Sequence, residues 1–233
     1  MAVSVDRVYQ TVLALANKEQ RGYITPQEYN LFANQAQNEI FEQYFYDLNQ
    51  FLRAPVGNKT ASSDLRDIVE EKISMFRVVN QQSANINTNV YRLEAVRYRE
   101  TATGNFYTAE EVSKKEYDTL HMSKLMSPPV NRPVFYRSSN HIYGSPDYVS
   151  NYDSTRIDYI RKPISPNWTY IVVDSKALWN PSASDMRNFE LHSSEEKNLV
   201  TKILQYAGVS IKDFNLSQVA GQKEVSTIQQ EKA

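Results

Sequence analysis

The stretch from Asn17 to Glu28 has the outline of a calcium-binding loop, and it offers the most specific metal-like spacing in the chain. Gly22 stands at the sixth place, Ile24 at the eighth and Glu28 at the twelfth. Arg21, however, stands where an oxygen ligand is required, and its positive charge would repel a cation. The chain also has no cysteine, which excludes a thiolate zinc site. We therefore expect a plain helix–turn–helix corner here, with no metal and no cofactor.

The three histidines are the candidates for general acid–base catalysis: His121, His141 and His192. They lie far apart in the sequence, and no two have the spacing of metal ligands. A catalytic triad can assemble from distant residues, so a small hydrolase with an unrecognised triad stays open as an alternative. No GxSxG nucleophile elbow is present, and His192, beside Ser193, is interpreted as part of a helix cap. We assign no catalytic residue and expect that the protein is not an enzyme.

Charge and composition exclude several classes of protein. The 233 residues include 26 Lys and Arg against 27 Asp and Glu, a net charge of −1. That balance excludes a polybasic nucleic-acid coat and an acidic disordered chain. The six glycines stand singly, which argues against a phosphate-binding glycine loop. No apolar run is long enough to span a membrane, and we expect neither a signal peptide nor a membrane partner.

Helical periodicity dominates the first third of the chain and returns near its end. Apolar residues recur at three- and four-residue spacing in Val3–Lys18, Pro26–Arg53 and Ser63–Val78. Thr25 and Glu28 form a capping box before the second segment, which would be about 42 Å long as a helix. A further helix is expected after a similar box at Ser193–Glu196, ending at Gly208.

The middle of the chain changes to the alternating pattern of strands. Strands are expected at Val90–Tyr98, Val134–Arg137, His141–Tyr143, Arg156–Arg161 and Thr169–Val173. A third capping box, Thr108 with Glu111, predicts a short helix through Leu120. The connector before Trp168 contains Pro163 and Pro166 and has few conformations, so we expect the indole to fill a pocket.

These patterns predict an α+β fold: a helical bundle from the N- and C-terminal segments, with an inserted, mostly antiparallel β module. The expected parts are 1–80 (helical), 89–175 (β-rich), 185–210 (a helix that rejoins the bundle) and 211–233 (an extended docking tail). The tail carries four apolar residues: Ile211, Phe214, Leu216 and Val219. Because they are too few to close a core, we expect them to dock on a partner; the alternative is that they fold back on the bundle.

The long helix expected from Pro26 to Arg53 carries apolar residues on more than one side. At about 100° per residue, Tyr44, Phe45 and Tyr46 sweep roughly 200° of its surface, wider than the apolar stripe of a surface helix. Its polar positions are mostly amides, which are easier to desolvate than charges. We expect a subunit interface at Phe41, Tyr44, Phe45 and Tyr46. The alternative is an unusually buried helix within one chain.

Several segments, in their order along the chain, resemble virion structural proteins of tailed bacteriophages, particularly crAss-like and related Bacteroidota phages. The segments are Arg21–Ala33 with the long aromatic helix, Pro128–Tyr136, Asn140–Pro146, Ile157–Trp168 and Phe189–Ala220. The resemblance implies a non-enzymatic subunit of the head-to-tail connector or tail barrel, located at the portal vertex of the virion and in the host cytoplasm during assembly. It supplies no catalytic residue.

The resemblance also implies partners. It implies a ring of identical subunits, twelve-fold, beneath the portal, in contact with the portal or an adjacent tail-ring protein. Genome DNA would pass through the channel during ejection without sequence-specific binding, and the near-neutral charge suits such a wall. A virion decoration or cargo protein is the alternative within the same class, and the small hydrolase is the alternative from another class.

Overall fold

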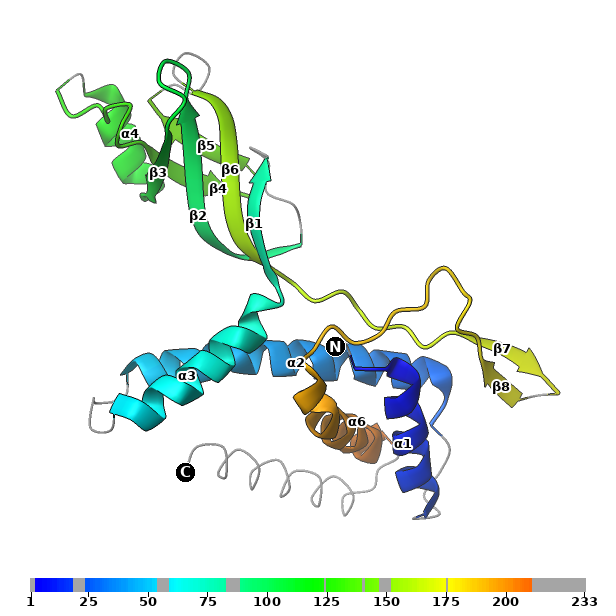
Figure 1. The fold of residues 1–233 in the computed structure, drawn as a ribbon. Helices are drawn as coiled ribbons and strands as arrows, with labels where there is room; N and C mark the ends of the chain where they lie inside the picture. Colours follow the sequence, from blue (N-terminus) through cyan, green and yellow to red (C-terminus); the bar gives the residue numbers. More distant parts are fainter. Residues whose placement is uncertain are drawn as a thin grey trace. The chain divides into compact units, whose positions relative to one another are not determined.

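A computed structural model describes residues 3–18, 24–53, 59–82, 89–123, 125–139, 141–146, 152–174 and 176–210. The chain divides into two compact units, and each is described by itself. The first unit combines Met1–Met75 with Pro163–Ala233, and the second unit is Phe76–Lys162. Figure 1 draws the elements of both units.

The first unit is built on helices from both ends of the chain. They are α1 (Val5–Lys18), α2 (Pro26–Arg53), α3 (Lys59–Ser74), the 3-10 helix η1 (Ser193–Glu195) and α6 (Glu196–Ser210). A short hairpin, β7 (Tyr170–Val173) with β8 (Lys176–Trp179), completes this unit. The bounds predicted for α2 are confirmed, and so is its cap: Thr25 donates to the Glu28 carboxylate from its backbone N (3.0 Å) and its hydroxyl (2.7 Å).

Trp168 lies at the centre of the first unit. Its side chain is almost fully buried, with the ring centroid 4.3 Å from that of Tyr9, whose ring in turn lies 4.6 Å from that of Tyr29. The Tyr29 hydroxyl donates to the Val5 carbonyl (2.9 Å), and burial raises the Tyr29 pKa well above its ordinary value. The prediction that Trp168 fills a pocket is confirmed.

The second unit is a six-stranded sheet that curls into a half-barrel (Figure 1). Its strands are β1 (Arg77–Gln82), β2 (Val90–Glu100), β3 (Phe106–Glu111), β4 (Val134–Ser138), β5 (His141–Ser145) and β6 (Tyr152–Arg161). They are ordered β1-β6-β2-β3-β4-β5, and the β3–β4 pair is parallel. One helix, α4 (Lys114–Met122), connects these two parallel strands. Val96, Tyr98, Phe135, Ile142 and Ile157 form the core of the sheet.

Gly144 of β5 lies close against the side chain of Tyr98 on β2. A Cβ atom built on Gly144 would lie 2.7 Å from the hydroxyl oxygen of Tyr98 and 2.9 Å from its Cζ. Tyr98 is buried on β2, so its ring has no room to retreat. Glycine is required on β5 for this close approach rather than for a special backbone angle.

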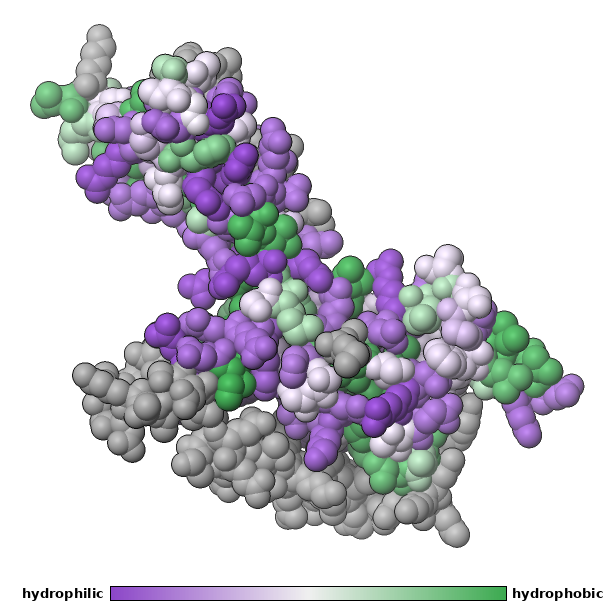
Figure 2. Space-filling view, viewed as in Figure 1, coloured by the Kyte–Doolittle hydropathy of each residue, from purple (hydrophilic) through white to green (hydrophobic). Residues whose placement is uncertain are grey.

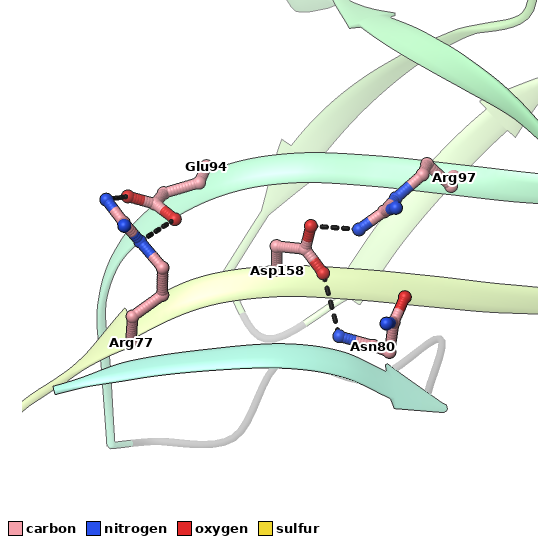
Figure 3. A network of polar contacts seen from close by, with 5 residues as sticks. All are labelled: Arg77, Asn80, Glu94, Arg97 and Asp158. Atoms are coloured by element: carbon pink, nitrogen blue, oxygen red, sulfur yellow. Dashed lines mark hydrogen bonds and ion pairs between the residues drawn. The ribbon is translucent and has the colours of Figure 1, made fainter. Parts of the chain in front are cut away.

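The polar face of the sheet carries ion pairs between β1, β2 and β6 (Figure 3). Arg97 lies directly opposite Arg156 in the strand register, an arrangement that would repel on its own. Asp158 offsets it, because one carboxylate oxygen pairs with the Arg97 guanidinium and the other accepts the Asn80 backbone N–H (2.8 Å). Arg77 makes a bidentate pair with Glu94, with distances of 2.8 and 2.9 Å.

The predicted fold class is contradicted. The described residues form five helices and eight strands, and the curled six-stranded sheet is a dominant structure with mixed pairing, not a small β insert in a helical bundle. Strand β7, which falls in the stretch expected to be the β-rich module, pairs with β8 in the first unit. Strands β1 and β3 were not expected, so the six-stranded sheet was predicted too small; β8 of the separate hairpin was not expected either.

Two local corrections explain the missing strands. Thr108–Glu111 has the pattern of a capping box, but these residues lie in β3. Thr108 pairs with Arg97 of β2, and the pairing between the two strands outweighs the local tendency to start a helix. The helix begins later, where Ser113 Oγ accepts the Glu116 N–H (3.2 Å). The third expected helix extended to Val78, whereas α3 ends at Ser74 and Val78 already pairs with Tyr159 in β6.

The last helix also differs from its predicted end. His192 is part of a cap as expected, because it caps η1 and its Nδ1 accepts the Ser194 N–H (3.3 Å). Ser193, expected to open the capping box with Glu196, is instead the first residue of η1. Gly208 does not stop the helix, however, since α6 continues to Ser210. One glycine costs about 1 kcal/mol in a helix, which packing of Ile203 and Ala207 in the core can offset.

Candidate subunit interface

Helix α2 is enclosed on most sides by other elements of the first unit. Its buried residues include Tyr29, Ala33, Ala36, Ile40, Phe41, Tyr44 and Phe45. Tyr206 of α6 stacks on Phe32 at 6.3 Å, and Lys72 of α3 lies 5.6 Å above the Tyr44 ring. The wide apolar arc predicted for this helix is therefore largely a core feature of one chain.

Two of the amides on α2 form hydrogen bonds with chain segments distant in sequence. The Gln37 side chain is fully buried: Nε2 donates to the Ile164 carbonyl (2.8 Å) and Oε1 accepts the Glu190 N–H (3.0 Å). Asn30 Oδ1 accepts the Trp168 N–H (2.9 Å), and its Nδ2 donates to the Trp168 carbonyl (3.1 Å). These amides supply hydrogen-bond partners for backbone groups in the irregular segments before β7 and after β8. The sequence did not reveal this role.

One stripe of α2 stays exposed. Its residues recur at three- and four-residue spacing and cover roughly a 100° arc over about 33 Å of helix. We call it the outer stripe: Gln27, Leu31, Gln35, Asn38, Glu42, Tyr46 and Asn49. Leu31 is 70% exposed and Tyr46 is 62% exposed, while Glu42 carries the only charge of the set. Large apolar and aromatic side chains with few charges are typical of interface cores.

The residues predicted for the interface separate into two groups. Phe41, Tyr44 and Phe45 are buried in the first unit, with exposures of 2%, 4% and 7%, so they support the helix from inside. Tyr46 alone faces outward on the outer stripe. Sequence reasoning missed Leu31, although its four-residue spacing from Gln27 and Gln35 could have found it. The predicted docking residues Ile211, Phe214, Leu216 and Val219 lie outside the described residues.

Next to the outer stripe, Glu39 joins α2 to α6. Its carboxylate accepts the Tyr206 hydroxyl and pairs with Lys202 Nζ at 3.1 Å. Partial burial would raise the Glu39 pKa, but the hydrogen bonds from Tyr206 and Lys202 outweigh it and lower the pKa below its usual value. Glu39 therefore stays ionised at neutral pH and is engaged within the chain.

The histidines do not form a catalytic arrangement with an open nucleophile. His121 Nδ1 lies 3.4 Å from Ser145 Oγ, but Ser145 is only 1% exposed, so a substrate would not reach its hydroxyl. His141 packs edge-to-face against Tyr143, and His192 caps η1. These contacts give no support to the hydrolase alternative.

The calcium-like stretch is only partly described. Glu28, its twelfth residue, is engaged by Thr25, and that backbone hydrogen bond lowers its pKa. Residues 19–23 lie outside the described residues. Across the part of the chain that the structure describes, no three His, Cys, Asp or Glu side chains gather as a metal site would require.

A scan against protein-family models and a search of curated proteins each found no match to this chain. Among the described helices, none combines the length and the apolar character that crossing a membrane requires.

Proposed function

We propose that the chain is a non-enzymatic structural subunit of a phage head-to-tail connector or tail-barrel ring beneath the portal. Copies would associate side by side around a channel through which the genome passes. The portal or an adjacent tail ring would be the neighbour along the channel axis. The resemblance to tailed-phage virion proteins motivates the proposal, and the assembly chemistry below supports it.

The outer stripe of α2 carries the proposal. The outer stripe exposes Leu31, Tyr46 and several amides, with Glu42 as its single charge; Glu39, exposed beside it, is engaged by Lys202 and Tyr206. Amides and tyrosine can be desolvated and still form hydrogen bonds across a subunit boundary. A solvated helix face would instead carry more charged residues.

The basic residues of the sheet agree with a wall that does not hold DNA. Arg97 and Arg99 are paired with Asp158 and Asp153, and the Arg156 guanidinium lies 4.3 Å from the centroid of the Phe106 ring. A row of uncompensated arginines would bind phosphates strongly, whereas paired ones have less charge to offer. Passage without sequence-specific contact fits this balance.

Electron microscopy of the purified protein, together with its position in the virion, tests the proposal. We expect closed rings of one copy number, twelve by the resemblance, and labelling at the portal vertex. Protein distributed over the capsid surface or inside the head would favour a decoration or cargo role. A monomer at all concentrations that also turns over ester or peptide substrates would favour a hydrolase.

A further inference from the structure

The β7–β8 hairpin exposes apolar side chains on both of its faces. Ile171 pairs with Leu178 and Val172 with Ala177, so Ile171 and Leu178 share one face, and Val172 lies on the other. Val172 is 66% exposed, Ile171 52% and Leu178 48%. In Figure 2 the hairpin is a green, apolar projection of the first unit.

This hairpin is held firmly at its base and is uncovered beyond it. The Asn180 N–H donates to the Thr169 carbonyl (2.9 Å), and the Trp168 ring stacks on Tyr170 at 5.8 Å. A two-stranded hairpin is marginally stable in water by itself, and an exposed apolar patch typically marks an interaction site. The anchored base orients the arm before binding, which lowers the entropy lost on association.

We propose that the β7–β8 hairpin docks on the outer stripe of α2 in a second copy of this chain. The inference rests on the proposed function, because it names the contact that joins neighbouring subunits of the ring. The three most exposed large apolar side chains in the described part of the first unit lie on these two surfaces: Leu31, Val172 and Tyr46. Each surface would therefore cover apolar side chains that the other surface leaves exposed to water.

Area and charge both fit this pairing. On the hairpin face that also carries Lys176, three apolar side chains (Ile171, Val173 and Leu178, at 45 to 52%) leave on the order of 300 Å² uncovered, over a third of the ~800 Å² per partner in a standard interface. Lys176 pairs with Val173 in the register and so shares the face of Ile171 and Leu178. Its ammonium group is the natural partner of Glu42, the single charge on the outer stripe.

The pairing is compatible with a ring. Hairpin and outer stripe are different surfaces, so a copy can donate its hairpin to one neighbour and receive the hairpin of another, and such heterologous contacts form a ring where the rotation between copies closes. Hairpin-to-hairpin contact would be isologous and would stop at two copies.

Cross-linking between copies tests the docking, and the absence of native cysteines makes single labels possible. Full-length Ile171→Cys and Asn38→Cys chains are mixed under assembly conditions and treated with a short bis-maleimide. We expect a covalent dimer in the mixture and much less in either chain alone. Ser184→Cys, on an exposed turn, replaces Asn38→Cys as the matched control and should give no such dimer.

Exchanging the charges of Lys176 and Glu42 gives a second, independent test of the docking. Lys176→Glu and Glu42→Lys should each weaken assembly, roughly tenfold or more in the concentration needed, and the double variant should recover most of the loss. Cross-linking of Ile171→Cys with itself would show isologous pairing and overturn the proposal. Absence of the mixed cross-link, with faster maleimide labelling of Ile171→Cys once residues 211–233 are deleted, would make the chain's own tail the occupant and overturn it as well.

Rings that form without the hairpin-to-stripe cross-link would overturn this docking and leave the proposed function standing. Failure of the proposed function is a different result, because the protein would then form no ring and would be missing from the portal vertex.

Discussion

Trp168 Nε1 donates a hydrogen bond to Asp6 Oδ1 across 2.9 Å, joining residues 162 positions apart. We expect Trp168→Ala to lower the free energy of unfolding by about 3–5 kcal/mol, because it removes a nearly fully buried ring and leaves a cavity. Trp168→Phe should lose about 1–3 kcal/mol, since the ring stays but the Asp6 carboxylate loses its donor. Urea unfolding followed by circular dichroism measures both; a loss under about 1 kcal/mol for Trp168→Ala would show that the indole anchors no core.

Tyr46 and Tyr44 should respond differently to the same substitution. Tyr46→Asp should leave the monomer folded and block assembly, because the residue is 62% exposed on the outer stripe. Tyr44→Asp should destabilise the fold itself, because it places a carboxylate at a position that is 4% exposed. Circular dichroism and sedimentation at an assembly-competent concentration distinguish the two, with Ser184→Asp as the charge control. A folded Tyr46→Asp that assembles normally would remove Tyr46 from the interface.

Asp158 should matter more than Glu94, although both pair with an arginine. Asp158 serves Arg97 and the Asn80 N–H on different strands, and its side chain is 15% exposed. Asp158→Ala should cost about 1–3 kcal/mol, because it leaves partners of a part-buried network unsatisfied. Glu94→Ala breaks a pair whose members are 41% and 26% exposed and should cost about 1 kcal/mol or less. Thermal unfolding of the two variants under the same conditions makes the comparison, and equal losses would contradict it.

Lys72 and Glu195 form the most buried ion pair among the described residues. Lys72 Nζ lies 2.7 Å from Glu195 Oε1, with side-chain exposures of 19% and 4%, and Asn198 donates to the other oxygen. Glu195→Leu should cost about 3–5 kcal/mol, because it leaves Lys72 charged and unpaired near the core. Lys72→Met combined with Glu195→Leu should recover most of that loss. A double variant no more stable than Glu195→Leu would mean that packing, not charge, accounts for the effect.

The sequence by itself determined those features that depend on neighbours along the chain. The capping box at Thr25 and Glu28 and the uninterrupted run that follows it located α2, because caps and helical periodicity act within a few residues. The prolines before Trp168 correctly indicated a constrained connector with a buried indole.

Only the tertiary structure decided which of the local sequence patterns formed the element that they predict. Thr108–Glu111 has a helix-start pattern yet lies in β3, and Val78, expected at the end of a helix, lies in β1. In both cases the hydrogen bonds that decide the structure come from strands distant in sequence. The predicted interface divided in the same way. Tyr44, Phe45 and Tyr46 are equivalent as a sequence run, but α3 and α6 pack on α2, and of the three only Tyr46 is left on the outer stripe.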